Sequence, residues 1–219
     1  MNQILIATTN PGKIMTLKKI LAKLGYEGLS FSDLGLHLSE PEETKLTAEE
    51  ISAEKALGYA KQYKELPVLA RDDTTFLIGV DEEDDPKNHN KSFVARKMGK
   101  YTDENGEKAF SEVAHKYGGE VPIRFEWGFA LAWHENDQIK VVSGLATANT
   151  DKLKIVEEIS PKKVPGFCLA PVLKVLVNGT WRYDSELTEE DSWDAYWNLQ
   201  KDTIEKLIKQ CPLLDQAQN

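Results

Sequence analysis

The stretch Ile4-Leu5-Ile6-Ala7-Thr8-Thr9-Asn10-Pro11-Gly12-Lys13 decides how the chain begins to fold. Its apolar residues predict a buried strand, and the polar residues after them predict a turn that leads at once into a helix. Asn10 is a favoured N-cap residue, Pro11 fits the first helical position, and apolar residues recur at helical spacing until Gly25. The N-terminal region is therefore predicted to form a strand, a short loop and a helix.

This first turn also has the chemistry of an anion site. A helix that starts where a strand ends presents free backbone N–H groups and the positive end of its dipole, which suits a phosphate. Thr8, Asn10 and Lys13 are the candidate substrate-binding residues of the turn. It is not a P-loop, since Ala7 and Ile14 stand where that motif needs Gly and Ser or Thr. An ordinary strand-loop-helix connection is the alternative interpretation.

The size and composition of the chain predict a single folded domain. With 219 residues and 41% hydrophobic content it can bury one sizeable core, which we expect to span residues 1–210 as two lobes, followed by a tail at 211–219. It contains no run of about 18 apolar residues and no basic-apolar leader, which predicts a cytoplasmic protein that does not enter a membrane. Cys168 and Cys211 lack the paired spacing of a disulfide framework or a zinc site.

The net charge restricts the class of partner. A formal charge of -9 argues against a nucleic-acid polymer, because binding a polymer uses many clustered Lys and Arg side chains. A small anion needs only a few local cations and stays compatible with this charge. The densest acidic run, residues 81–85, is predicted to be a solvated loop rather than a metal site, because the residues after it have no hydrophobic periodicity.

Apolar periodicity predicts an alternation of helices and strands. Helices are expected over residues 47–63 and 104–117 and from Thr188 onward, and strands over 67–70, 76–80, 123–133, 139–143, 173–177 and 181–183. Asn136-Asp137 and Asn178-Gly179 have the residue types of hairpin turns. The fold class is therefore α/β, with a long mixed central sheet flanked by helices and two lobes that leave a ligand cleft between them.

A set of charged side chains in or near these elements could hold a metal ion and a polyphosphate together: Lys13, Glu50, Lys55, Asp72, Asp73 and Arg96. Mg²⁺ takes oxygen ligands and usually binds through one or two carboxylates plus substrate phosphates. Each member has an alternative role. Glu50 fits a capping box with Thr47, the two aspartates follow a predicted strand where turns favour aspartate, and Arg96 fits a surface cation.

The ordered motifs of the chain resemble those of the inosine triphosphate pyrophosphatase family, whose members hydrolyse non-standard purine nucleoside triphosphates. The resemblance covers about residues 4–173, and each motif in it is short. The motifs that carry it are Asn10-Pro11-Gly12-Lys13, Glu42-Glu43-Thr44, Leu46-Thr47, Glu50-Ile51-Ser52-Ala53-Glu54-Lys55-Ala56, Leu66-Pro67-Val68-Leu69-Ala70-Arg71-Asp72, Val94-Ala95-Arg96 and Gly166-Phe167.

This resemblance implies a two-lobed α/β homodimer that cleaves its substrate between the α and β phosphates, with Mg²⁺ as cofactor, to give a nucleoside monophosphate and pyrophosphate. It implies that Asn10 and Lys13 touch the phosphates and that Lys55 and Arg96 neutralise them further. Glu50 and Asp72 are the implied catalytic residues, and the metal ligands are expected among Glu50, Asp72 and Asp73. Phe167 is implied to stack on the base. These roles agree with phosphoryl chemistry, which depends on positioning and charge neutralisation.

Three departures from the family pattern change the expectation. Arg71 stands where the family has the first of two acidic residues, Cys168-Leu169-Ala170-Pro171 replaces a Gly-Tyr-Asp-Pro motif, and Ser192-Trp193-Asp194 replaces the Ser-His-Arg that reads the purine 6-oxo group. The losses fall on base recognition while the phosphate and metal positions largely remain. We therefore expect an altered base preference, because a site without its donors discriminates differently.

Two alternatives of other classes stay open. The substitutions at Arg71 and Ala170 fit a nucleotide-binding protein of the same fold with impaired catalysis. The aromatic residues of the last predicted helix, Trp193, Tyr196 and Trp197, could form a stacking surface, but a helical aromatic stripe more often belongs to a core or an interface. A protein that binds no nucleotide and uses these aromatics for interaction is the remaining possibility.

Overall fold

A computed structural model describes residues 2–87, 90–148 and 150–215 of the chain. These residues divide into two compact units. Unit 1 consists of Met1–Asp73, Trp127–Ala146 and Leu199–Asn219, and unit 2 consists of Thr74–Glu126 and Thr147–Asn198. Three strands pass from one unit into the other, with the changes falling after Asp73, after Glu126 and after Ala146.

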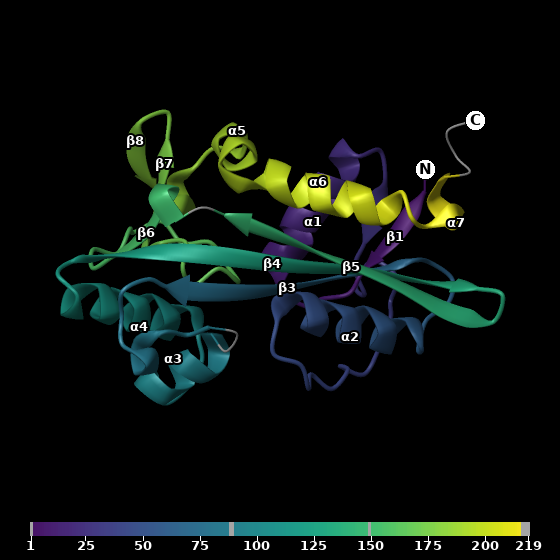
Figure 1. Cartoon of the computed structure of the whole chain (residues 1–219), viewed down its shortest axis with the longest axis horizontal. Helices are drawn as coiled ribbons and strands as arrows, with labels where there is room; N and C mark the ends of the chain where they lie inside the picture. The colour runs from purple at the N-terminus through teal and green to yellow at the C-terminus, as the bar shows by residue number, and fades with distance from the viewer. Residues whose placement is uncertain (1, 88–89, 149, 216–219) are drawn as a thin grey trace. The chain divides into compact units, whose positions relative to one another are not determined.

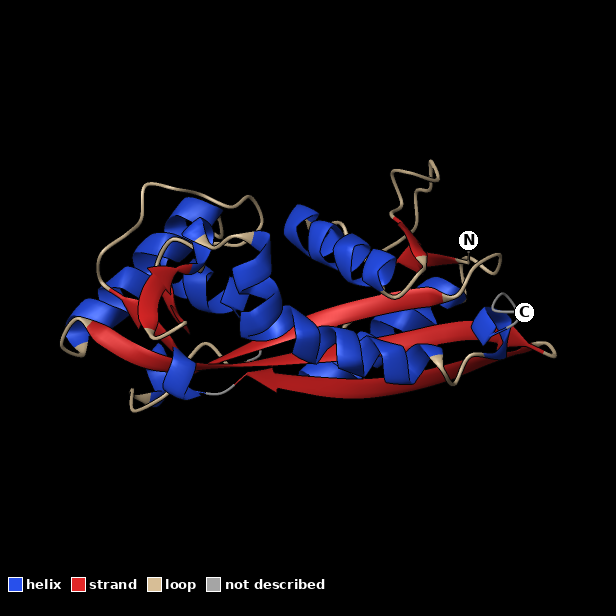
Figure 2. Cartoon of the chain, turned by 90° about the horizontal axis from the view of Figure 1, so that it is seen from above, coloured by secondary structure: helices blue, strands red, loops and turns tan. Residues whose placement is uncertain are grey.

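The strands form a mixed sheet, as the sequence predicts. They are β1 (Gln3–Ile6), β2 (Glu27–Leu29), β3 (Val68–Leu77), β4 (Glu120–Glu135), β5 (Gln138–Ala148), β6 (Leu153–Val156), β7 (Leu173–Val177) and β8 (Thr180–Tyr183). They pair in the order β2-β1-β3-β4-β6-β7-β8, with β5 on β4. Figure 2 draws the strands in red and the helices in blue. β1 is parallel to β2 and β3, whereas β6 is antiparallel to β4 and β7, and β8 is antiparallel to β7.

The main helices are α1 (Pro11–Lys23), α2 (Ala48–Ala60), α3 (Asn90–Met98), α4 (Asp103–Lys116) and α6 (Asn198–Ile208), with the short helices α5 (Glu189–Ser192) and α7 (Pro212–Asp215) (Figure 1). Several begin at a side-chain cap. The side chains of Asn10, Thr47, Thr102 and Thr188 each accept a hydrogen bond from the backbone N–H three residues later. These caps satisfy donors that a helix start leaves free, and they confirm the helix starts predicted at Pro11 and after Thr188.

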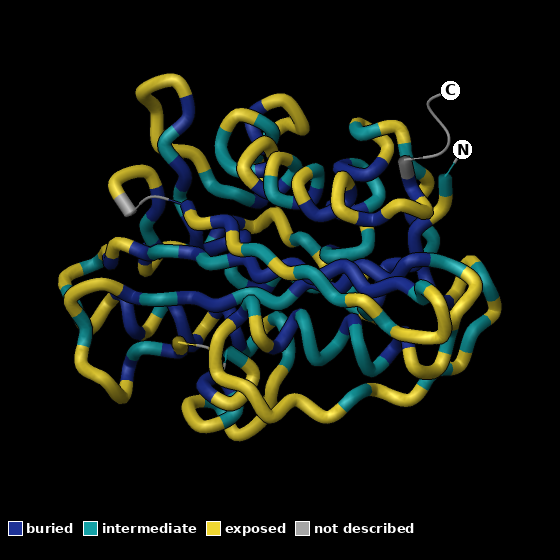
Figure 3. Tube along the Cα trace, turned by 45° about the vertical axis from the view of Figure 1, so that its right-hand side comes forward, coloured by how far each residue is buried: buried dark blue, intermediate teal, exposed yellow. Residues whose placement is uncertain are grey.

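In unit 1, α1 and α2 cover opposite faces of β1 and β3 (Figure 1). On one face, α2 contributes Ala56, Tyr59 and Ala60 to a buried cluster with alternate strand residues such as Leu5 and Val68. On the other face α1 approaches so closely that a Cβ added to Gly28 would lie 2.9 Å from Leu21 Cδ1. Alternate strand side chains thus pack against the helices on the two faces. Figure 3 shows buried residues along the strands.

In unit 2, α3 and α4 pack through Phe93 and Phe110, whose ring centroids lie 5.3 Å apart. β7 buries every second residue, including Val175, and β6 buries Leu153 and Ile155 together with Val156 at its end. The predicted hairpins are confirmed, one in each unit. Asn136-Asp137 in unit 1 and Asn178-Gly179 in unit 2 all have positive φ, the backbone that a two-residue turn of type I′ needs.

The structure corrects two predictions about polar segments. The expected break at Arg71-Asp72-Asp73, with a separate strand over 76–80, is wrong, because β3 runs without interruption from Val68 to Leu77. The expected solvated loop at 81–85 is wrong for Asp84, which is fully buried in a 3-10 turn at Glu82–Asp84. In both places oppositely charged side chains from distant elements neutralise the carboxylates.

The C-terminal region is packed as far as the structure describes it. Residues 212–215 form α7, where the sequence predicts a tail, and Leu214 is buried while its backbone oxygen accepts a hydrogen bond from Asn2 Nδ2 at 2.7 Å. Residues 216–219 of the predicted tail lie outside the described residues. None of the described helices has the length and apolar character needed to cross a membrane.

Candidate functional site

The loop between β1 and α1 is ordered by its own polar side chains. Thr8 Oγ1 accepts a hydrogen bond from the backbone N–H of Asn10 at 3.2 Å, and Asn10 Oδ1 accepts one from the backbone N–H of Lys13 at 3.0 Å. Pro11 at the first helical position has no N–H to satisfy. The predicted phosphate loop is therefore a preformed helix start with the Lys13 side chain in its first turn.

The Lys13 side chain reaches from α1 to β3, where its Nζ lies 3.4 Å from Asp73 Oδ2. The neighbouring carboxylate, Asp72, receives a hydrogen bond from Lys55 Nζ of α2 at 2.8 Å. Consecutive strand residues point to opposite faces, so each aspartate meets the lysine of the helix that covers its own face. The structure places Lys13 with Asp73 on one face of β3 and Lys55 with Asp72 on the other face, as two ion pairs rather than one acidic pair.

The Arg71 guanidinium binds the Asp73 carboxylate and stabilises its charged form. Its Nε donates to Asp73 Oδ1 at 2.6 Å and its Nη2 donates to Asp73 Oδ2 at 3.2 Å, while the Arg71 side chain is only 4% exposed. Burial acts most strongly on the pKa of Asp73 and would raise it, yet the charges of Arg71 and Lys13 together hold that pKa below its ordinary value. Both oxygens of Asp73 are thus engaged by cations.

Lys55 lies between two carboxylates. Its Nζ is 2.8 Å from Asp72 Oδ1 and 2.8 Å from Glu43 Oε1, and the lysine is largely buried. Burial is the largest effect on the pKa of Lys55 and would lower it, but the adjacent carboxylates raise it above its ordinary value. Lys55 is therefore held as a charged ammonium at neutral pH, the state that a phosphate-binding lysine requires.

Glu50 lies in the first turn of α2 and is exposed. Its carboxylate Oε2 accepts a hydrogen bond from the Thr47 hydroxyl at 2.8 Å, and Thr47 Oγ1 accepts from the backbone N–H of Glu50 at 3.2 Å. The capping role that the sequence left open is thus present in a modified form, through the hydroxyl of Thr47. An exposed carboxylate with one such contact keeps lone pairs for another ligand.

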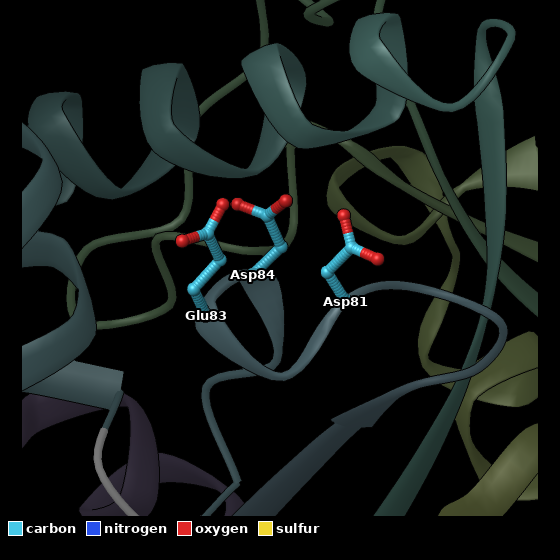
Figure 4. A group of neighbouring side chains, drawn as sticks. All are labelled: Asp81, Glu83 and Asp84. Atoms are coloured by element: carbon cyan, nitrogen blue, oxygen red, sulfur yellow. The ribbon is translucent and has the colours of Figure 1, made fainter.

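A different acidic group has the tightest clustering. Among the described residues, Asp81, Glu83 and Asp84 are the group of three acidic side chains whose ligand oxygens lie within 4.8 Å of one another (Figure 4). Asp84 accepts hydrogen bonds from Lys116 Nζ at 2.6 Å and Tyr117 Oη at 2.9 Å, and it also pairs with Lys97. Burial would raise the pKa of Asp84, but these donors lower it to about 2. The cluster is consequently a structural ion-pair network.

The two predicted binding residues of unit 2 have their own surroundings. Arg96 is exposed on α3, where its Nη2 donates to the backbone oxygen of Glu83 at 3.0 Å and its guanidinium lies 5.7 Å from the centre of the Phe93 ring. Phe167 is half-buried and its backbone N–H donates to Val164 at 3.0 Å, in a turn where Gly166 has a φ of 81°. Their proposed contacts with a nucleotide stay predictions.

The aromatic residues near the C-terminus lie in an unusual helix. Residues Trp193–Trp197 form a π-helical segment between α5 and α6, and the Trp193 and Trp197 rings meet edge to face at 5.4 Å. Trp197 is buried, and the Tyr196 hydroxyl donates to Asp184. The spacing of apolar residues predicted a regular α-helix here, because that spacing does not reveal a short π-helical segment.

Sequence reasoning missed two residues of the charged network, Glu43 and Arg71. Both stood within the motifs that carried the family resemblance, but neither was a candidate for a role. For Arg71 the available signal was the two-residue spacing to Asp73, since residues i and i+2 of a strand share a face. For Glu43 there was no such signal, because its contact with Lys55 depends on how a loop is laid along α2.

The chain resembles known proteins over most of its length. Residues 4–149 match the Ham1 family. A dITP/XTP pyrophosphatase of Bacillus subtilis (strain 168) is 31% identical over 211 residues, which make up 95% of this chain and 96% of that protein. A dITP/XTP pyrophosphatase of Bradyrhizobium diazoefficiens is 39% identical over 79 residues, so that this similarity spans only 36% of each chain.

Among solved structures, a HAM1 protein from Coxiella burnetii shares the fold, with a TM-score of 0.65 and 21% identity over 96% of this chain and 100% of that chain. The matched motifs begin in β1 and extend through the lysine and aspartate residues of α1, α2 and β3. The family predicted from the short motifs is thereby confirmed: this chain belongs to the Ham1 family.

Proposed function

We propose that this protein hydrolyses nucleoside triphosphates between the α and β phosphates, releasing a nucleoside monophosphate and pyrophosphate. One observation carries the proposal. Two lysine–aspartate pairs, Lys13 with Asp73 and Lys55 with Asp72, lie at consecutive residues of β3, the first on the face covered by α1 and the second on the face covered by α2. The names of the Bacillus subtilis and Bradyrhizobium diazoefficiens relatives, dITP/XTP pyrophosphatases, support the same reaction.

The cations suit a triphosphate tail. Lys13 stands in the first turn of α1, where the helix dipole adds positive potential, and Lys55 of α2 is held in its charged state. We assign phosphate binding to these two lysines, with Thr8 and Asn10 shaping the loop. Arg96 is proposed as a further phosphate-binding residue, as the family resemblance implies, since an exposed guanidinium forms bidentate hydrogen bonds with phosphate oxygens.

The acidic residues fit a magnesium ion. Carboxylate oxygens are the ligands that Mg²⁺ prefers, and Glu50 and Asp72 each have one carboxylate oxygen engaged in a side-chain hydrogen bond. We assign them to the metal in preference to Asp73, whose two oxygens are both held by Arg71 and Lys13. When bound, Mg²⁺ would neutralise charge on the transferred phosphate. We also assign to the Asp72 carboxylate the orientation of the attacking water.

Base recognition is proposed to differ from the family pattern. Phe167 is half-buried and offers a ring for stacking, but Ser192-Trp193-Asp194 provides neither the histidine nor the arginine of the family motif. Ser192 Oγ is already donating to the backbone oxygen of Thr188 at 3.0 Å. We therefore propose that the site lacks the hydrogen-bond donors that would recognise a purine 6-oxo group. The protein should then distinguish less strongly between purines with and without that group.

The test is pyrophosphate release from a panel of standard and deaminated nucleoside triphosphates in the presence of Mg²⁺. The expected result is turnover of at least one triphosphate, a flatter preference across bases, and a loss of about 100-fold or more in kcat/KM for Asp72→Asn. Glu112→Gln, an exposed carboxylate of α4, is the matched control and should keep full activity. Absence of turnover for every triphosphate rejects the enzymatic proposal.

The second candidate is a nucleotide-binding protein with impaired catalysis. The observation that favours it is the Arg71 guanidinium, which replaces an acidic residue of the family pattern and binds both oxygens of Asp73. In that case a nucleotide would raise the melting temperature without being hydrolysed. A homodimer and a cytoplasmic location remain predictions, and light scattering of the purified protein tests the dimer.

A further inference from the structure

The turn that contains Phe167 is attached to the first half of α4 on both sides of that residue. Gly166, with a φ of 81°, donates its backbone N–H to Asp103 Oδ2 at 2.9 Å. Cys168 lies so close to α4 that a Cβ added to Gly106 would be 2.6 Å from both the Cβ and the Sγ of the cysteine. Asp103 and Gly106 are three residues apart, so they lie on one side of the helix.

A third contact on the same side of α4 holds the segment that leads into this turn. Lys163 forms an ion pair with Glu107, which lies four residues after Asp103. The Glu107 side chain is only 9% exposed, whereas that of Lys163 is 49% exposed. We name Asp103, Gly106 and Glu107 the α4 anchor.

These contacts matter because the apolar packing beside the turn is incomplete. A cavity of about 560 Å³ lies between the first half of α4 and the segment that precedes Gly166, with Val164 and Pro165 in its wall. A segment beside such a space lacks the close side-chain contacts that would resist its movement. The hydrogen bond from Gly166 to Asp103 therefore restrains the backbone next to Phe167 where packing does not.

The turn also has hydrogen bonds of its own. The backbone N–H of Phe167 donates to the backbone oxygen of Val164 at 3.0 Å, and the backbone oxygen of Phe167 accepts from the N–H of Ala170 at 3.1 Å. These bonds preserve the shape of the turn without attaching it to α4. Loss of the attachment should therefore let the turn shift as a unit, with Phe167 in it.

We propose that the α4 anchor, and Asp103 in particular, holds Phe167 in the position from which it stacks on the nucleobase. This inference rests on the proposed function, in which Phe167 stacks on the base. Asp103 is then a positioning residue, which acts through the backbone of Gly166 and not through contact with the nucleotide. Its loss should weaken the binding of the nucleoside part of the substrate and leave the binding of the phosphates unchanged.

The experiment compares two probes by isothermal titration at fixed Mg²⁺ and ionic strength. Inorganic tripolyphosphate measures the phosphate site alone. The α,β-methylene analogue of ATP, which cannot be cleaved between the α and β phosphates, measures phosphates and base together, and an aromatic ring stacks on any base. Asp103→Ala is expected to raise the dissociation constant of the nucleotide analogue about three- to tenfold, the effect of one lost hydrogen bond, and to leave that of tripolyphosphate unchanged.

Three variants of α4 serve as controls. Glu104→Ala removes an exposed carboxylate from the same first turn of the helix and should change neither dissociation constant. Asp103→Asn keeps an acceptor oxygen for the Gly166 N–H and should retain most of the affinity. Gly106→Ala displaces the turn from its other side and should weaken only the nucleotide analogue. Melting temperatures establish that each variant folds.

A double-mutant cycle tests whether Asp103 acts through Phe167. Phe167→Ala alone should raise the dissociation constant of the nucleotide analogue about fivefold or more, and the addition of Asp103→Ala should then have no further effect. The inference is overturned if Asp103→Ala has the same effect in both backgrounds, if it leaves the nucleotide constant unchanged, or if it weakens tripolyphosphate equally.

The outcomes separate this inference from the proposed function. If the unaltered protein binds tripolyphosphate and releases pyrophosphate from a nucleotide, any of those three results removes only the role of the α4 anchor. If the unaltered protein binds neither probe and releases no pyrophosphate from any nucleotide, the proposed function fails and this inference fails with it.

Discussion

Replacement of Gly128 by alanine is expected to lower both the unfolding free energy of the protein and its catalytic activity. Gly128 lies on β4 under the start of α2, and an added Cβ would lie 2.1 Å from the backbone carbon and oxygen of Ala48 and 2.4 Å from the backbone nitrogen of Glu49. Ordinary contacts of a Cβ begin at 3.4 Å, so the two backbones must separate by about 1 Å or more. Backbone atoms cannot rotate aside as a side-chain end can.

The cost of this separation is expected near the upper end for overpacking, about 3 kcal/mol of unfolding free energy. For a chain of this size that corresponds to a fall in melting temperature of about 6–12 °C, which circular dichroism can measure. Because the first turn of α2 carries Glu50, the shift should also lower kcat/KM at temperatures where the variant is folded.

Gly144→Ala is the matched control. Its added Cβ would meet side-chain ends, with Thr203 Cγ2 at 3.2 Å and Leu207 Cδ2 at 3.6 Å, which can give way at a cost of less than about 1 kcal/mol. A Gly128→Ala protein that melts within about 2 °C of the unaltered one would refute the reasoning, because it would mean that α2 has free room to move.

Three further substitutions test the charged network of β3, the carboxylate of Asp184 and the loop that precedes α2. Asp73→Asn leaves the buried Arg71 guanidinium without its anion and should cost about 3–5 kcal/mol of unfolding free energy in urea denaturation. Because the pKa of Asp73 is held below its ordinary 3.8, the stabilisation by its charge is present at neutral pH and is lost as the pH falls below 3.8. The unfolding free energy of the variant should therefore fall less steeply in acid than that of the unaltered protein. Burial raises the pKa of Asp184 to about 7, which makes the unaltered protein lose stability as the pH rises from 3.8 to about 7. Asp184→Asn should therefore gain in melting temperature relative to the unaltered protein at pH 8 but not at pH 4, and a difference independent of pH would contradict the assignment. Glu54→Ala removes the acceptor of the Thr44 backbone and hydroxyl groups, and limited proteolysis should then cut residues 39–47 several-fold faster.

Features that depend on neighbours along the chain could be predicted from the sequence alone. Asn10 and Pro11 start α1 because a side-chain oxygen three residues from a free N–H can cap it wherever the helix is later placed. The turn at Asn178-Gly179 follows from residues that tolerate positive φ. The same locality explains why the candidate lysines and carboxylates, quoted as short ordered motifs, identified the family.

Burial of charge, in contrast, was decided by contacts between distant segments. Arg71, Asp72 and Asp73 have the composition of a turn, yet they continue β3 because lysines from α1 and α2 and the arginine itself neutralise the carboxylates. Asp84 is buried for the same reason, through Lys97 and Lys116. A carboxylate enters a protein interior only with a compensating partner, and a one-dimensional pattern does not contain the distance to that partner.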